Sequence, residues 1–193
     1  MWVRRAAIRP VPPFAQITRR ALAEVEEKLA DDGEEARQRL DDAFSRFEET
    51  QPALAFRVTS ALSAPLDETA LALGYFLTLA VWLAFDAVFG SDLDEITETA
   101  LAGVEESLQL DEQLRLSDPA EALDSDDVVA MEQPEALAFV HEHLDAALEA
   151  NADEVDVDDV HSIYRVVLIE VLALSYAVRP PANAQAFGAE FTA

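Results

Sequence analysis

The sequence predicts an all-α protein of about seven helices, arranged as a helical bundle with two similar helical hairpins at its centre. Apolar residues recur at spacings of three, four and seven along much of the chain, which is the period of one helix face. No segment alternates in polarity as a strand does, and the chain has only five glycines for hairpin turns. With 51% hydrophobic residues, 193 residues can bury a sizeable core.

Two similar segments open the predicted hairpins. A Gln-Pro pair at residues 51–52 is followed by Ala-Leu-Ala-Phe, and a second pair at 133–134 is followed by the same four residues after one extra Glu. A long apolar pattern of helical spacing follows each segment. We therefore expect the apolar helices at 68–89 and 158–178 to pack against each other as two halves of one core.

The chain divides into a basic arm, one helical domain and a tail. The arm, 1–13, ends in a proline-rich stretch that favours extended backbone. The domain spans 14–178, and the tail at 179–193 is expected to be flexible because it starts with a Pro-Pro stop and continues with small residues. The domain is predicted to contain N-terminal acidic helices at 14–49, the first hairpin and a following helix at 50–110, an acidic linker at 111–131, and the second hairpin at 132–178.

Within these parts, turn and cap residues set the predicted helix limits. Gly33 interrupts the N-terminal pattern and divides it into two helices. Pro52 suits the first turn of a helix, where its missing N–H costs nothing. Asp67 is expected to cap the first long apolar helix, and Gly90 is expected to end it before the next helix at 93–110.

The charge of the chain is strongly uneven. There are 39 acidic and 13 basic residues, which gives a net charge of −26, while the first 20 residues contain five arginines and no acid. An acidic body repels nucleic acid and anionic membranes, so we expect no nucleic-acid partner. The acidity is consistent with solubility in a salty interior, with a basic protein partner, or with mimicry of nucleic-acid phosphates.

The absence of cysteine excludes disulfides, thiolate metal sites and cysteine nucleophiles. The start of the chain has arginines but no apolar run behind them, as a secretory signal would have, so a cytoplasmic location is expected. Residues 70–89 carry one charge, Asp86, and are long enough to span a bilayer. The related helix carries His161, Arg165 and Glu170, which favours two buried core helices over membrane spans.

All three histidines lie in the second hairpin. Asp158 and His161 share a helix face with Arg165, and antiparallel packing of the hairpin would bring Asp145 towards them. Carboxylate and imidazole groups can hold a divalent metal or move protons, which makes Asp145, Asp158 and His161 the candidate metal ligands. The alternative is that these are exposed positions with ordinary ion pairs. The run beginning at His141 lacks the second histidine of a zinc-protease motif, and no phosphate loop or other cofactor motif is present.

Both ends of the chain contain candidate partner-binding residues. Arginines and a tryptophan in the arm could reach an acidic surface, including that of a second copy, or fold back on the acidic body of their own chain. Two phenylalanines in the tail are four residues apart, as in short docking helices, although a tail without function is the alternative. The candidates are Trp2, Arg4, Arg5, Arg9, Phe187 and Phe191.

These observations favour a non-enzymatic protein that binds a protein partner or associates with itself. The alternatives are a helical enzyme that binds a metal or small molecule around His161, and a membrane-associated protein anchored by 70–89.

Overall fold

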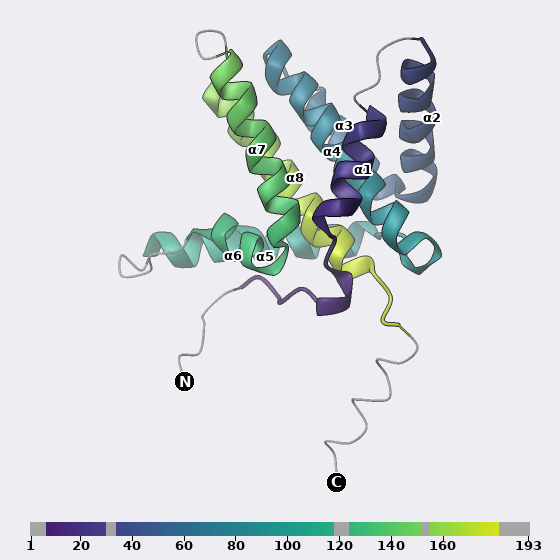
Figure 1. Cartoon of the computed structure of the whole chain (residues 1–193). Helices are drawn as coiled ribbons and strands as arrows, with labels where there is room; N and C mark the ends of the chain where they lie inside the picture. The colour runs from purple at the N-terminus through teal and green to yellow at the C-terminus, as the bar shows by residue number, and fades with distance from the viewer. Residues whose placement is uncertain (1–6, 30–33, 118–123, 152–154, 182–193) are drawn as a thin grey trace.

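The computed structural model describes residues 7–29, 34–117, 124–151 and 155–181 (Figure 1). This part of the chain forms eight α-helices and no strand, which confirms the predicted all-α class. The helices are α1 (Arg19–Leu29), α2 (Glu34–Thr50), α3 (Pro52–Leu62), α4 (Glu68–Phe89), α5 (Glu98–Ser117), α6 (Ser125–Glu132), α7 (Pro134–Ala150) and α8 (Val157–Ala177). Short 3₁₀ helices lie at Pro13–Ala15 and Gly90–Asp92.

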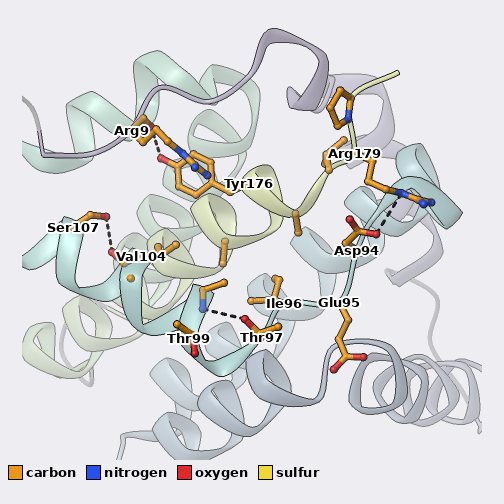
Figure 2. Close-up of a pocket in the computed structure, with 16 residues that line it drawn as sticks. Arg9, Asp94, Glu95, Ile96, Thr97, Thr99, Val104, Ser107, Tyr176 and Arg179 are labelled. Atoms are coloured by element: carbon orange, nitrogen blue, oxygen red, sulfur yellow. Dashed lines mark hydrogen bonds and ion pairs between the residues drawn. The ribbon is translucent and has the colours of Figure 1, made fainter. Parts of the chain in front are cut away.

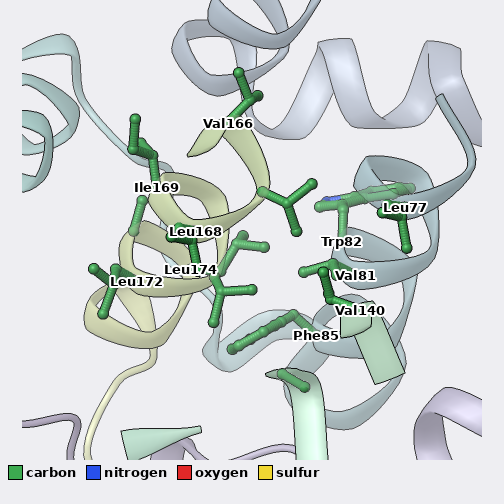
Figure 3. Packing of buried hydrophobic residues seen from close by; sticks show 14 of the residues in the cluster. Leu77, Val81, Trp82, Phe85, Val140, Val166, Leu168, Ile169, Leu172 and Leu174 are labelled. Carbon is green, nitrogen blue, oxygen red and sulfur yellow. The ribbon is translucent and has the colours of Figure 1, made fainter. Parts of the chain in front are cut away.

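Helices α4 and α8 lie side by side at the centre of the core, as predicted from their apolar composition (Figure 3). Gly74 allows the close approach, because a Cβ there would stand 3.0 Å from Cδ1 of Ile163. Trp82 and Phe85 of α4 and Leu172 of α8 are fully buried in this core. Burial of large apolar side chains is the main favourable contribution to folding, so this helix pair organises the rest of the chain.

The two central helices run parallel. At their N-terminal ends, the Asp67 amide donates to the Asp159 carboxylate at 2.8 Å, and the Asp156 amide donates to the Asp67 carboxylate at 3.1 Å. At their C-terminal ends, Leu93 and Val178 form an isolated antiparallel bridge. Asp67 also caps α4 by accepting from the amide of residue 70, as predicted. The N-terminal ends of the central pair are therefore joined by bonds from backbone amides to carboxylates, and the C-terminal ends by backbone hydrogen bonds.

An internal repeat explains this parallel arrangement. Residues 17–29 and 96–108 share the pattern Ile-Thr-x-x-Ala-Leu-Ala-x-Val-Glu-Glu-x-Leu, which begins just before α1 and α5. The threonine of each copy makes the same hydrogen bond at the start of its helix. Thr18 Oγ1 and Thr97 Oγ1 each accept from the amide three residues later, at 3.3 Å and 3.2 Å. The chain is therefore two consecutive four-helix repeats, α1–α4 and α5–α8.

The helix contacts are also matched between repeats. Helix α1 packs on α4 as α5 packs on α8, and α2 packs on α3 and α4 as α6 packs on α7 and α8. Across the repeats, α1 contacts α7 as α5 contacts α3, and α4 contacts α7 as α8 contacts α3. This is the contact pattern of two units related by an approximate local two-fold axis.

A buried glutamine in each repeat holds the other repeat. The Gln51 side chain donates to the Asp94 carbonyl at 3.1 Å and accepts from the Ile96 amide at 2.9 Å. Gln133 donates to the Ala15 carbonyl at 2.8 Å and accepts from the Ile17 amide at 3.2 Å. Each side-chain amide thus pairs with backbone groups just before the first helix of the other repeat, which is why a Gln-Pro pair occurs twice.

The similarity that follows the Gln-Pro pairs is out of register in the structure. Both prolines begin a helix, so the following positions match one for one without an inserted residue. Phe56 is consequently 75% exposed on α3, whereas Phe139 is 1% exposed on α7. The Gln-Pro pairs are equivalent, but the two Ala-Leu-Ala-Phe runs are not.

Several predicted boundaries differ from the structure. The acidic linker expected at 111–131 is helical at both ends, because α5 continues to Ser117 and α6 begins at Ser125. Asp111 is buried and hydrogen-bonded there, so its charge does not indicate a loop. The helix expected at 93–110 starts only at Glu98, because the preceding residues pair with Gln51 and with the end of α8.

The described part of the basic arm lies on the second repeat. The Ala7 amide donates to Asp111 at 2.9 Å, and the Val11 amide donates to Glu132 at 2.9 Å. Ile8 and Val11 are each 4% exposed. The arm therefore packs on its own acidic body over these residues.

Among the described residues, two helices are long and apolar enough to cross a membrane. They lie at 68–92, with a mean hydropathy of 1.9, and at 157–177, with a mean hydropathy of 1.4. Inside this fold, 56% and 67% of their most apolar windows are buried. A soluble core helix has the same properties, so length and composition alone carry no conclusion about a membrane.

Candidate functional site

The two repeats contain grooves at matched positions, each between the long central helix of a repeat and helices from the first half of the same repeat. In the first repeat the groove lies between α2 and α4, and in the second it lies between α5, α6 and α8. Counted from the N-caps of α4 and α8, Tyr75 and Tyr164 are equivalent residues, and each lines its groove. The groove of the first repeat is lined mainly by apolar side chains, and the groove of the second repeat mainly by polar and charged ones.

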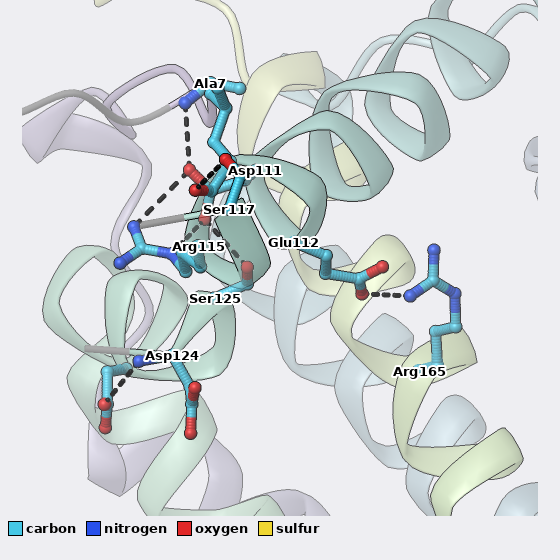
Figure 4. Close-up of polar contacts among 10 residues, drawn as sticks. Ala7, Asp111, Glu112, Arg115, Ser117, Asp124, Ser125 and Arg165 are labelled. Atoms are coloured by element: carbon cyan, nitrogen blue, oxygen red, sulfur yellow. Dashed lines mark hydrogen bonds and ion pairs between the residues drawn. The ribbon is translucent and has the colours of Figure 1, made fainter. Parts of the chain in front are cut away.

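The groove of the second repeat is polar and has a volume of about 480 Å³. His161 and Arg165, which were singled out from the sequence, both line it. Arg165 pairs with Glu112 of α5 (Figure 4). His161 is exposed. The polar groove is lined by Glu112, Arg115, Leu116, Asp124, Ser125, Asp126, His161, Tyr164, Arg165 and Leu168.

Tyr164 joins three helices at the side of the polar groove. Its hydroxyl donates to the Asp126 carboxylate at 3.3 Å, and His141 Nε2 lies 2.7 Å from the same oxygen. Burial raises the pKa of the Tyr164 phenol well above its usual value, and the negative charge of Asp126 raises it further. The phenol therefore stays protonated at neutral pH, and His141 acts as the second hydrogen-bonding partner. This contact chain braces α6, α7 and α8.

Asp111 is a fully buried carboxylate beneath the same groove. It accepts from Arg115 Nε at 2.5 Å, from Ser125 Oγ at 2.8 Å and from the Ala7 amide (Figure 4). Burial alone would raise the pKa of Asp111, but these hydrogen bonds and the Arg115 charge outweigh it and hold the pKa below its usual value. These partners belong to the arm, to α5 and to α6, so the Asp111 carboxylate joins these three segments.

The predicted metal ligands do not form one site. Asp145 and Asp158 are exposed, and neither lines the polar groove that His161 enters. No group of three or more His, Asp or Glu side chains within the described ranges is placed to hold a metal ion. The sequence located Arg165 and His161 correctly on one surface, but α7 packs on α6, α4 and α1 rather than closely on α8, so Asp145 does not reach them.

The groove of the first repeat is apolar and has a volume of about 650 Å³. Phe44 of α2 and Tyr75 of α4 meet across it edge to face, with ring centroids 6.1 Å apart. Tyr75 is 45% exposed, and Phe44 and Leu40 are only partly buried. The apolar groove is lined by Leu29, Leu40, Asp41, Phe44, Ser45, Ala72, Tyr75, Phe76 and Leu79.

Matched positions show how the two grooves differ. Counted back from Gln51 and Gln133, Phe44 of the apolar groove corresponds to Asp126 of the polar groove. Phe44 contacts Tyr75 by its ring, whereas Asp126 accepts a hydrogen bond from Tyr164. On the central helices, Phe76 likewise corresponds to Arg165 and Leu79 to Leu168.

The predicted partner-binding residues are described only in part. The Arg9 guanidinium lies over the Tyr176 ring, 4.1 Å from its centroid, and the Arg9 carbonyl accepts from the Tyr176 hydroxyl. Trp2, Arg4, Arg5, Phe187 and Phe191 lie outside the described residues. The sequence did not single out the apolar groove, although the repeated Ile-Thr segment would have matched the two repeats and drawn attention to Tyr75 and Tyr164.

Comparison with known proteins gives no further assignment, since no protein-family model, no curated protein and no solved structure matches this chain.

Proposed function

We propose that this protein is a non-enzymatic binding protein whose apolar groove receives a basic amphipathic helix of a partner protein. The observation that supports this most directly is the set of partly exposed apolar side chains along one channel of about 650 Å³. Folding leaves Leu40 and Phe44 of α2 and Tyr75 of α4 incompletely buried where the two helices face each other. Exposed apolar surface in a concave channel is typical of binding sites for apolar side chains.

The shape of the channel suits a helix. A neighbouring hollow at the N-terminal end of α4 shares Ala72 and Phe76 with the groove, and another beside α1 shares Leu29 and Leu40. The hollows thus follow α4, whose 22 residues extend for about 33 Å at the rise of an α-helix. A channel of this kind fits a helix whose apolar side chains recur every three or four residues.

The charge favours a basic partner. Asp67 and Glu68 line the hollow at one end of the channel and Asp41 lines its middle, while the hollow at the other end contains Asp42 and Asp86 together with Lys28, Arg39 and Arg46. Some of this charge is neutralised, since Asp86 pairs with an arginine of α2 at 2.5 Å. The net charge of −26 nevertheless attracts a cationic helix and repels an anionic one over most of the surface.

A synthetic helix tests the proposal directly. We expect a fluorescent peptide with a leucine face and lysine on its other faces to bind saturably, as measured by anisotropy. A peptide with the same leucine face and glutamate in place of lysine should not bind, because charge decides the partner class. Tyr75→Asp should abolish binding of the lysine peptide, since it places a carboxylate in the channel.

Phe56→Asp is the matched control, because Phe56 is an exposed aromatic residue outside the groove. It should leave binding unchanged. Equal binding to the Tyr75→Asp and Phe56→Asp variants would show only general attraction to an acidic surface and would refute the groove as the site.

A further inference from the structure

A third groove lies between the basic arm, α5 and the C-terminal end of α8 (Figure 2). Its volume is about 630 Å³, and it shares no residue with the apolar groove. A Cβ added to Gly103 would meet no atom within 4 Å, so the groove is open along α5. Small and apolar residues form much of the lining: Ile96, Ala100, Gly103, Val104, Ala173, Ala177 and Val178.

The described part of the chain ends at this groove. Residues 178–180 line one end of it, and Pro181 is the last residue that the structure describes (Figure 2). Two contacts fix this end of α8, since Val178 forms a bridge with Leu93 and the Arg179 amide donates to the Asp92 carbonyl at 2.8 Å. The segment that follows Pro181 therefore starts at the rim of the groove.

That segment suits the groove in composition and in length. Residues 182–193 lie outside the described part of the chain, and their sequence contains five alanines and one glycine together with Phe187 and Phe191. The two rings are the large apolar groups that a groove with a small-residue lining can receive. From Thr97 to Ser107 the groove follows α5 for about 15 Å, and twelve residues extend for about 18 Å even when they are helical.

The charges of the groove and the segment are complementary. The Arg9 guanidinium lies over the Tyr176 ring, 4.1 Å from its centroid, and makes no ion pair with a carboxylate among the described residues. The acids that line the groove lie elsewhere, since Asp94 pairs with Arg179 at 3.3 Å and Glu95 lies at the edge away from Arg9 (Figure 2).

The segment carries a single charge, which has the sign that Arg9 lacks. Glu190 is its one charged residue, and it lies next to Phe191 and three residues after Phe187. A segment whose rings enter the groove therefore brings one carboxylate to the groove. Arginine pairs well with a carboxylate, because its planar guanidinium can donate two hydrogen bonds to it.

We propose that residues 182–193 fold back into the third groove of their own molecule, with Phe187 and Phe191 against α5 and α8 and Glu190 paired with Arg9. Attachment at the rim gives the segment a high effective concentration at the groove, so even a weak contact fills it. The third groove is then a surface that the chain itself covers, and it opens to other molecules only when the segment leaves.

Thiol accessibility in the full chain tests this docking, because the sequence has no cysteine of its own. Ala100→Cys places a single thiol at an exposed position in the groove. Its alkylation by iodoacetamide, followed by mass spectrometry, should be several-fold slower than in a chain that also carries Phe187→Asp and Phe191→Asp. Ala21→Cys, at the matched position of α1, should react at one rate in both backgrounds. Equal rates for the Ala100→Cys thiol in the two backgrounds would overturn the proposal.

A charge exchange tests the contact of Arg9 with the segment. Arg9→Glu and Glu190→Arg should each speed alkylation of the Ala100→Cys thiol, because each places two like charges together. The two changes combined restore an opposite pair and should restore protection. A double variant that reacts as fast as the single ones would refute the pairing of Arg9 with Glu190.

Protein concentration distinguishes the segment's own molecule from a second copy. Docking within one molecule gives the Ala100→Cys thiol the same alkylation rate at every protein concentration. A rate that falls as the concentration rises would show that the segment of another copy fills the groove, and it would overturn the proposal.

Discussion

Glu170 of α8 occupies the position that Val81 occupies in α4, counted from the N-caps of the two helices. Both residues are fully buried. Neither carboxylate oxygen of Glu170 has a hydrogen-bond partner within the described part of the chain, and burial raises its pKa well above the usual value. One repeat therefore carries an unsatisfied carboxyl group at a place where the other carries an aliphatic side chain.

Glu170→Val should stabilise the protein. The change removes a buried polar group that lacks a partner, which typically costs about 1–3 kcal/mol, and introduces the residue that the first repeat uses at the same place. Urea unfolding followed by circular dichroism at neutral pH should show a higher midpoint. The reciprocal change, Val81→Glu, should lower it. Equal midpoints for wild type and Glu170→Val would contradict a net cost of burying this carboxyl group.

The same carboxyl group predicts a pH dependence. The pKa of Glu170 is raised in the folded state, whereas in the unfolded state it is about 4.3. Below that pH the carboxyl group is protonated in both states, so it adds no pH dependence to the free energy of unfolding. As the pH rises above that value, only the unfolded state ionises, and stability falls by up to about 1.4 kcal/mol per pH unit until the folded pKa is reached.

Glu170→Gln lacks this titration and serves as the reference. The difference in unfolding free energy between Glu170→Gln and wild type should grow from pH 4.5 towards pH 7 in favour of the variant. Other carboxylates titrate in both proteins and cancel in the difference. A constant difference across this range would contradict a raised pKa for Glu170.

The sequence predicted the parts of the fold that depend on one helix at a time. The apolar runs in α4 and α8 identified the core helices, and Asp67 identified a cap. The linker prediction failed because buried Asp111 is satisfied by Arg115 and Ser125, and composition cannot distinguish a paired acid from a solvated one.

The grooves were harder to predict because their side chains come from different helices. Phe44 and Tyr75 are far apart in sequence, and helical periodicity does not give the angle at which α2 crosses α4. His161 could be placed on an exposed face from its spacing, but the absence of Asp145 from the same groove depends on how α7 rotates against α8. Aligning the two repeats in the sequence would have reduced the number of residues that could line the two grooves.

The two buried glutamines should be unequal in their effect on stability. Gln51→Ala removes two hydrogen bonds to the segment around Ile96, and Gln133→Ala removes two to the segment around Ile17 together with one to Ser175 at 2.8 Å. Each variant leaves buried backbone groups unpaired, so each should lose about 1–3 kcal/mol or more. Gln133→Ala should lose more.

Thermal and urea unfolding of both single variants and of the double variant measure this difference. Because the two glutamines hold separate segments, their effects should add to within about 0.5 kcal/mol. A larger loss for Gln51→Ala would mean that the Ser175 contact contributes nothing to stability.

Gly74 and Gly103 should respond in opposite directions to the same substitution. A Cβ at Gly74 would stand 2.5 Å from Leu62 Cδ2 and 3.0 Å from Ile163 Cδ1, whereas one at Gly103 would meet nothing within 4 Å. Gly74→Val therefore forces the buried Leu62 and Ile163 side chains to repack and should cost about 1–3 kcal/mol. Gly103→Val should be neutral or slightly stabilising, since valine has the higher helix propensity. Urea unfolding at low salt compares the two, and a Gly74→Val variant as stable as wild type would show that close approach at Gly74 does not hold the two repeats together.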